Sequence, residues 1–133
     1  MNKISTTWII DDDDTYRYAI QFFLKRAEIT ESMEFFHHGK AALDSLVELI
    51  GRNEKLPDLI LLDINMPVLD GWQFLDEFEK LRPALNQEIK IYMVSSSIDE
   101  DDFSRVKKID SVTGLIVKPI TKNDIQKIAS AFY

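Results

Sequence analysis

The chain has no cysteine among its 133 residues, so disulfide bonds and thiol chemistry contribute nothing to its fold or activity. Its opening segment lacks the long apolar run of a signal peptide or a membrane span. Positive charge is also scarce, because 16 Lys and Arg stand against 23 Asp and Glu for a formal net charge of -7. This balance argues against nucleic acid or anionic membranes as partners. We therefore expect a cytoplasmic protein whose partner offers a basic or apolar surface.

Glycine and proline are few, at four residues each, and no linker, repeat or low-complexity segment interrupts the chain. A chain of this length with 45% hydrophobic residues corresponds to about one domain and can bury a core. The sequence therefore predicts a single domain over residues 1–133.

Short apolar runs alternate with amphipathic stretches along the whole chain, a pattern that favours βαβ units. The run Leu59-Ile60-Leu61-Leu62 is apolar at successive positions, as expected for a central strand covered on both faces. Each predicted strand is followed by an amphipathic helix, which makes five strand and helix pairs in an α/β fold. The predicted strands span about residues 7–11, 32–36, 59–62, 89–94 and 114–117.

Three of these apolar runs end in charged residues, namely Asp11 and Asp12, Asp63, and Lys118. The carboxyl ends of parallel strands share one edge of the sheet, which is where open α/β folds place their ligands. Three carboxylates and one ammonium would then converge on one pocket. Such a pocket suits a divalent cation and a phosphoryl group.

Four segments carry a closer likeness to a known family. IIDDDD, LPDLILLDINMPVLDGW, MVSSS and LIVKPI, in this order and over essentially the whole chain, resemble the receiver domain of bacterial two-component response regulators. The resemblance implies a doubly wound, flavodoxin-like fold with a parallel sheet of order 2-1-3-4-5 flanked by five helices. It also implies that Asp63 accepts a phosphoryl group from a phosphohistidine on a sensor histidine kinase or a histidine phosphotransfer protein, in a signalling protein that is not an enzyme.

The resemblance implies a Mg²⁺ site as well, with Asp12, Asp63 and the backbone carbonyl of Asn65 as the protein ligands. Asp11 is expected to act through water or from behind these ligands. Magnesium prefers oxygen ligands and is usually held by one or two carboxylates, which fits this set. Without metal, the three carboxylates repel one another and raise at least one pKa in the cluster, so metal affinity should fall in mild acid.

Two further residues have roles in the family. Lys118 is expected to pair with the phosphoryl oxygens or, before transfer, with Asp63, and Pro119 to follow a cis peptide bond. Ser95 matches the hydroxyl that moves toward a phosphoryl oxygen and donates a hydrogen bond to it.

Two positions flank the reactive group, and a third position, Leu115, departs from the family. Asn65 and Ser97 stand where family members influence how water reaches the acyl phosphate, and the short Ser97 predicts a persistent phosphoryl group. Leu115 replaces the aromatic residue that many receivers turn inward on activation. Phosphorylation is therefore expected to change the surface through backbone movement and leucine packing.

Other interpretations remain open at this point. Asp13 and Asp14 fit helix capping, and Asp11 and Asp12 could do the same. A metal-dependent phosphohydrolase with an aspartyl-phosphate intermediate shares the Asp, cation and Lys, but usually has an acid where this chain has Asn65. A receiver-like module that binds partners without phosphorylation is the third possibility. The chain ends just after its last predicted helix, so the sequence predicts no output domain. Output is then expected to pass through a separate protein target, which the sequence does not identify.

Overall fold

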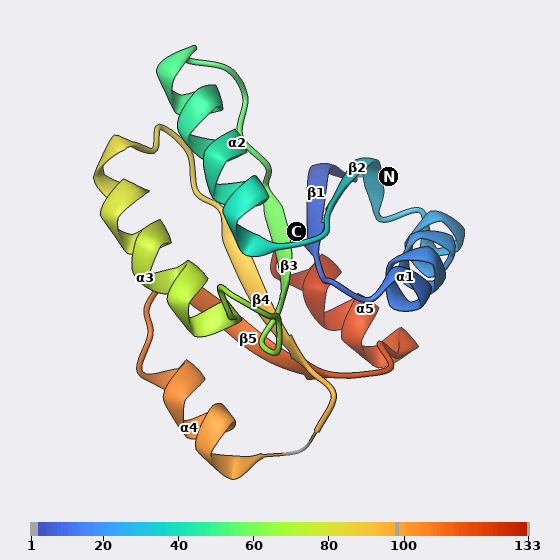
Figure 1. The fold of residues 1–133 in the computed structure, drawn as a ribbon. Helices are drawn as coiled ribbons and strands as arrows, with labels where there is room; N and C mark the ends of the chain where they lie inside the picture. The colour runs from blue at the N-terminus through green and yellow to red at the C-terminus, as the bar shows by residue number, and fades with distance from the viewer. Residues whose placement is uncertain (1–2, 98, 133) are drawn as a thin grey trace.

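The structure, a computed structural model, describes residues 3–97 and 99–132. Within them lies one parallel sheet with the order β2-β1-β3-β4-β5, which confirms the predicted order (Figure 1). Its strands are β1 (Ile4–Ile10), β2 (Thr30–Phe36), β3 (Leu59–Asp63), β4 (Lys90–Ser95) and β5 (Val112–Val117).

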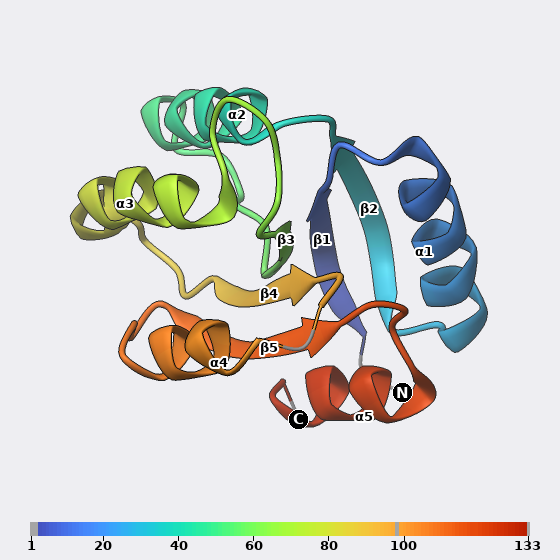
Figure 2. The same ribbon diagram turned by 60° about the horizontal axis from the view of Figure 1, so that its bottom comes forward.

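Five α-helices connect and follow these strands in the described part of the chain. They are α1 (Asp14–Ala27), α2 (Gly39–Gly51), α3 (Gly71–Leu81), α4 (Glu100–Lys107) and α5 (Lys122–Ser130), with a short 3-10 turn at Arg82–Ala84 after α3. Figure 2 shows α1 and α5 on one side of the sheet and α2, α3 and α4 on the other. The doubly wound α/β fold predicted for the chain is therefore confirmed.

Alternation along the strands produces two cores, one on each face of the sheet. Trp8 and Ile10 join the core under α2 and α3, whereas Ile9 between them joins the core under α1 and α5. Successive side chains of a strand point to opposite faces, so this division follows from the pleat itself. All five residues of β3 are buried, as expected for the central strand.

Helix starts are set by short polar side chains. The carboxylate of Asp13 accepts a hydrogen bond from the Tyr16 backbone N–H at 3.2 Å and caps α1, which confirms the capping interpretation for Asp13. Asp70 and Gln73 form a reciprocal capping box at α3. His38, whose Nδ1 accepts from the Ala41 N–H at 3.2 Å, caps α2.

Two details differ from the sequence-based expectations. β1 begins at Ile4, earlier than predicted, because its polar start pairs with β2 and Thr7 donates a hydroxyl hydrogen bond to Thr30 at 2.9 Å. The helical spacing of Ala19, Phe23 and Ala27 in the sequence predicts that they face inward on α1, but all three are exposed because the helix rests on a narrower stripe. The residues that it buries are Arg17, Ile20 and Leu24.

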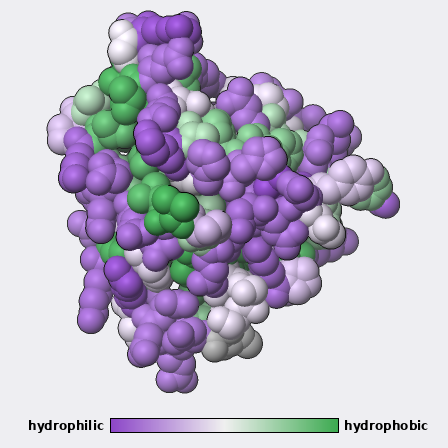
Figure 3. All heavy atoms as spheres, viewed as in Figure 1, coloured by the Kyte–Doolittle hydropathy of each residue, from purple (hydrophilic) through white to green (hydrophobic). Residues whose placement is uncertain are grey.

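The helix α4 is lightly anchored, since Val106 is its one buried side chain in the described chain. Hydrophilic residues cover most of the face seen in Figure 3, and hydrophobic side chains gather over α2 and α3. Among residues 3–97 and 99–132, no helix combines the length and the apolar character needed to cross a lipid bilayer.

Candidate metal and phosphoryl site

The charged residues predicted to converge do so at the carboxyl edge of the sheet. Asp63 ends β3 and Ser95 ends β4, while Asp11 and Lys118 directly follow β1 and β5. The backbone N–H of Lys118 donates to the Ser95 carbonyl at 2.7 Å, and that of Asp11 donates to the Phe36 carbonyl at 3.1 Å. The end of β3 is joined to β4 in the same way, since the Ile64 N–H donates to the Val94 carbonyl at 2.9 Å.

Three carboxylates form the acidic part of the site. Asp11, Asp12 and Asp63 each place a carboxylate oxygen within 4.8 Å of the others. Asp11 is 1% exposed and Asp63 is 4% exposed, whereas Asp12 is exposed. The plain capping role considered for Asp11 and Asp12 is wrong, since Asp13 caps the helix.

The two oxygens of Asp11 differ in their surroundings. Oδ1 accepts a hydrogen bond from the Asp13 backbone N–H at 2.9 Å. Oδ2 is buried and faces the Lys118 ammonium at 2.8 Å. Three carboxylates that offer oxygens within 4.8 Å of one another, two of them buried, suit a divalent cation, so the residues present fit the predicted metal.

Lys118 supplies the positive charge of the site. Its Nζ lies 2.8 Å from Asp11 Oδ2 and 3.7 Å from Asp63 Oδ1, so Asp11 is its nearer partner. The ring of Tyr16 covers the same ammonium, with Nζ 4.1 Å from the ring centroid. The peptide bond between Lys118 and Pro119 is cis, as the resemblance implied.

Burial and like charges act on the Asp63 carboxyl. Burial, followed by the negative charge of Asp11, raises the pKa of Asp63 to about 7, against the opposing effects of Lys118 and the Asn65 N–H. The Asn65 backbone N–H lies 3.4 Å from Asp63 Oδ1. This raised pKa favours the protonated carboxyl when no cation is bound, and a protonated carboxyl is a poor nucleophile.

The Ser95 hydroxyl faces the loop that follows it. Its Oγ donates to the Ser97 carbonyl at 3.0 Å and accepts from the Ser97 N–H at 3.2 Å. The side chain is fully buried. Ser95 must therefore break this local turn to donate a hydrogen bond toward Asp63.

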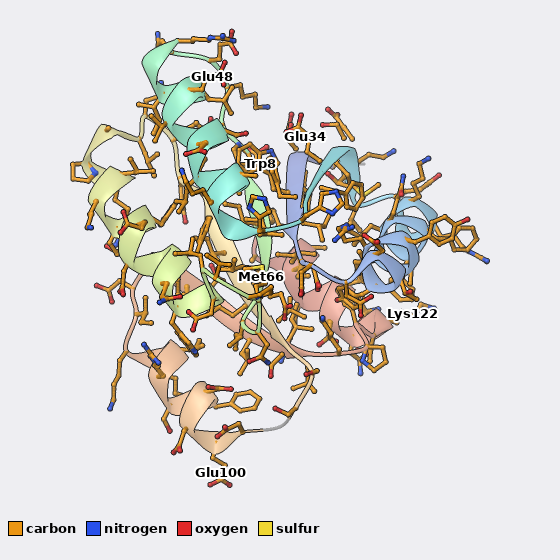
Figure 4. The ribbon with its side chains drawn as sticks, in the orientation of Figure 1. Trp8, Glu34, Glu48, Met66, Glu100 and Lys122 are labelled. Atoms are coloured by element: carbon orange, nitrogen blue, oxygen red, sulfur yellow. The ribbon has the colours of Figure 1, made fainter. Side chains whose placement is uncertain are left out.

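The loop after Asp63 returns tightly against the strand. The Gly71 N–H donates to the Ile64 carbonyl at 2.9 Å, and a Cβ at Gly71 would come within 2.8 Å of the Asp63 carbonyl oxygen. A residue with a side chain would therefore push α3 away from the reactive strand end. Met66, labelled in Figure 4, lies on this loop with its side chain buried.

Two residues of α1 also belong to the site, and sequence reasoning missed both of them. Arg17 is buried and donates hydrogen bonds to the Asp11 carbonyl oxygen and the Asp14 carboxylate. Tyr16 covers Lys118, although its periodicity indicated only a packing role. One signal could have identified Arg17. It is a charged residue beside the apolar stripe of a helix, and that helix directly follows a strand that ends in acidic residues.

The neighbourhood of α3 and α4 shows what accompanies Leu115. Leu115 is half-buried and packs against the core under α2 and α3, with no aromatic ring at that position. The Arg105 guanidinium of α4 lies 4.2 Å from the centroid of the Trp72 ring, at the start of α3. Trp72 is buried, which fits a packing role.

Solved structures share this fold. A two-component response regulator from Cytophaga hutchinsonii superposes with a TM-score of 0.90 at 28% identity, covering 98% of this chain and 97% of that chain. The receiver domain of the histidine kinase CKI1 from Arabidopsis thaliana, in complex with Mg²⁺ and BeF3-, superposes with a TM-score of 0.77 at 24% identity, covering 94% of this chain and 89% of that one. The second likeness shows the shared fold.

Sequence relatives include regulators and kinases. The probable methanogenesis regulatory protein FilR2 of Methanothrix harundinacea is 27% identical over 119 residues, which cover 90% of this chain and 75% of that protein. The sensor histidine kinase CheAY of Helicobacter pylori is 33% identical over 111 residues, which are 83% of this chain but only 13% of the kinase. Receiver domains pair with histidine kinases.

Residues 7–130 match the response regulator receiver domain as a family. The sheet order and the three clustered carboxylates agree with that match. The chain therefore belongs to the receiver domains of two-component signalling, and its acidic pocket is typical of receivers that accept a phosphoryl group.

Proposed function

We propose that Asp63 accepts a phosphoryl group from a phosphohistidine on a sensor histidine kinase or a histidine phosphotransfer protein in the cytoplasm. An Asp63 carboxylate oxygen attacks phosphorus, the P–O bond forms as the P–N bond breaks, and the imidazole of the donor leaves. The observation that carries the proposal is the placement of Asp63, a buried strand-end carboxylate clustered with Asp11 and Asp12 within 4.8 Å.

Asp11, Asp12 and Asp63, with the Asn65 carbonyl, are the proposed holders of Mg²⁺. The clustering of their three carboxylates within 4.8 Å, with Asp11 and Asp63 buried, supports this assignment. When bound, Mg²⁺ offsets the negative charge that the carboxylates and phosphoryl oxygens share. The Arabidopsis receiver with Mg²⁺ and BeF3- shows that the same fold accommodates both species in another protein.

Lys118 balances charge on the transferred group. Its ammonium already lies 3.7 Å from Asp63 Oδ1, and the lysine stem is flexible. A small rotation of that stem brings Nζ from Asp11 onto an oxygen of a phosphoryl group on Asp63. Phosphoryl transfer depends mainly on such positioning and charge stabilisation.

Ser95 couples phosphorylation of Asp63 to a change at the protein surface. A hydrogen bond from Ser95 to a phosphoryl oxygen requires the hydroxyl to release the carbonyl and N–H of Ser97. That release changes the loop between β4 and α4, and α4 is lightly anchored by Val106. We propose that the resulting shift, transmitted through backbone and the packing of Leu115, changes the affinity for a protein target.

Labelling with a small phosphodonor tests the proposal. Incubation with acetyl phosphate and Mg²⁺ should add one phosphoryl group to the intact mass of the wild type. Asp63→Asn should abolish the gain, because the amide cannot form the acyl phosphate. Asp44→Asn is the matched control, since Asp44 is exposed on α2 and pairs only with Lys40 in the described structure.

The outcomes separate the remaining interpretations. A mass gain that survives in Asp63→Asn contradicts the assignment of the acceptor. A wild type that shows no gain with acetyl phosphate or with a phosphorylated histidine phosphotransfer protein supports a module that binds partners without phosphorylation. A gain that vanishes when Mg²⁺ is chelated supports the metal ligands named above.

A further inference from the structure

The Tyr16 ring and the carboxylates of Asp11 and Asp63 together enclose the ammonium of Lys118. Asp11 and Asp63 approach Nζ at 2.8 and 3.7 Å, and the Tyr16 ring lies over it at 4.1 Å from the centroid. The lysine side chain is consequently only 17% exposed. Tyr16 therefore contacts the lysine ammonium of the site directly, from the first turn of α1.

From this geometry we infer that Tyr16 is a positioning residue, whose ring face holds the Lys118 ammonium beside Asp63 during phosphoryl transfer. This inference rests on the proposed function of Asp63 and Lys118. Its chemical basis is the negative face of an aromatic ring, which attracts an ammonium held within about 6 Å of the centroid. The attraction strengthens where water is excluded, as it is here.

The neutrality of the ring matters to the chemistry. A further carboxylate at the position of Tyr16 would hold Lys118 by charge and compete with the incoming phosphoryl oxygens for the ammonium. A ring attracts the ammonium more weakly, so Nζ stays close yet free to move from Asp11 toward Asp63. Burial, with the charges of Asp11 and Asp63, raises the pKa of the Tyr16 hydroxyl, so the side chain stays uncharged at neutral pH.

The backbone and the packing of Tyr16 hold its ring in place. Its N–H is bonded to the capping carboxylate of Asp13, and its ring packs against the core under α1 and α5. The hydroxyl oxygen is buried and has no hydrogen-bond partner among the residues described by the structure. The contact with Lys118 therefore depends on the ring face and not on the hydroxyl, which predicts that phenylalanine can replace tyrosine.

Three variants test this inference. Tyr16→Leu removes the ring, Tyr16→Phe keeps it, and Tyr18→Leu makes the same change at an exposed position of the same helix. With acetyl phosphate, Tyr16→Leu should lower the rate of phosphorylation about 3- to 20-fold. Tyr16→Phe and Tyr18→Leu should stay within about twofold of the wild type, and the Mg²⁺ dissociation constant of Tyr16→Leu should change by less than about threefold.

A nuclear magnetic resonance measurement on the wild type keeps the test independent of whether Tyr16→Leu folds. The ε-methylene protons of Lys118 should be shifted upfield by the ring current, and Tyr16→Phe should retain the shift. Absence of the shift in the wild type overturns the inference. An unchanged phosphorylation rate in folded Tyr16→Leu also overturns it, as does an equal loss in Tyr16→Phe.

These results are distinguishable from failure of the proposed function. If the wild type takes no label on Asp63, the proposed function itself fails. If the wild type is labelled and Tyr16→Leu is labelled equally fast, the function stands and only the role of Tyr16 is wrong.

Discussion

Asp63 lies in an environment that opposes its own charge. The carboxyl is buried and faces Asp11, and both effects raise its pKa, to about 7, from an ordinary value of 3.8. A folded protein that keeps such a group ionised loses stability, because the unfolded chain accommodates the charge in water. The arrangement makes sense for a site that receives a cation, which removes the repulsion.

Asp63→Asn should therefore stabilise the metal-free protein. At pH 8 in the presence of a chelator, we expect its free energy of unfolding to exceed that of the wild type by about 1–3 kcal/mol. The folded pKa lies above the unfolded one, so wild-type stability is highest in acid and falls as the pH rises from about 4 through about 7. Urea titrations across that range measure the difference.

The gap between the two proteins should narrow toward pH 4, where Asp63 is protonated in the folded state and resembles the amide. Asp44→Asn serves as the exposed control and should show no such pH-dependent gain. A variant no more stable than the wild type at pH 8 would contradict the raised pKa.

We predict that the short side chain of Ser97 makes the phosphoryl group on Asp63 persistent. Its side chain is short and exposed, and its backbone is engaged with the Ser95 hydroxyl, so it offers little reach to orient water toward an acyl phosphate. Ser97→Glu supplies a longer side chain that can orient or activate water.

Loss of the phosphoryl group, followed by intact mass after removal of the donor, should be about three- to tenfold faster in Ser97→Glu. Ser104→Glu, which adds the same charge on the exposed surface of α4, should leave the rate unchanged. Equal rates in wild type and Ser97→Glu would refute the predicted persistence.

The start of α3 is packed against the strand end that carries Asp63. A Cβ on Gly71 would meet the Asp63 carbonyl oxygen at 2.8 Å and the Ile64 Cα at 2.9 Å, both of them backbone atoms that cannot turn aside. In contrast, a Cβ on Gly51 at the end of α2 would meet no atom within 4 Å among the residues that the structure describes. Two helical glycines thus have opposite packing environments.

Gly71→Ala should lower the free energy of unfolding by about 2 kcal/mol or more, because the helix must move off the loop. Gly51→Ala is the matched control and should raise stability by about 0.5–1 kcal/mol through the reduced freedom of the unfolded chain. Urea denaturation of both proteins measures the contrast. A Gly71→Ala variant as stable as Gly51→Ala would disprove the close approach.

Much of the fold and part of the site could be predicted from the sequence, for identifiable reasons. The apolar run of β3 and the charges at three strand ends are local patterns, and a parallel sheet converts them into one pocket. The contact between Tyr16 and Lys118 was not predictable, because periodicity assigns a residue to a face but not to a neighbour from the other end of the chain. The resting bonds of Ser95 depend on loop geometry, which no pattern encodes.

Across the molecule, the sheet order is what brings chemistry together. β1 and β3 are adjacent at the centre, and β4 and β5 extend from them, so Asp11 and Lys118 from opposite ends of the chain meet at 2.8 Å. The net charge of -7 makes the chain as a whole attractive to cations. Binding of a divalent cation at the acidic cluster should therefore stabilise the whole fold.

Mg²⁺ should raise the stability of the whole protein, because it binds the folded site and not the unfolded chain. We expect the midpoint of thermal unfolding at pH 8 to rise with Mg²⁺ concentration in the wild type. The rise should be largely lost in Asp12→Asn, whose exposed side chain makes it a ligand change with little effect on packing. An identical rise in both proteins would indicate that the ion binds elsewhere.

The most direct measurement is the location of the phosphoryl group within the modified chain. After reaction with a phosphorylated histidine phosphotransfer protein and Mg²⁺, peptide mapping by mass spectrometry should place the group on Asp63. The bond should be cleaved by hydroxylamine, as expected for an acyl phosphate. A hydroxylamine-resistant group on Ser95, Ser96 or Ser97, or on any residue other than Asp63, would contradict the account.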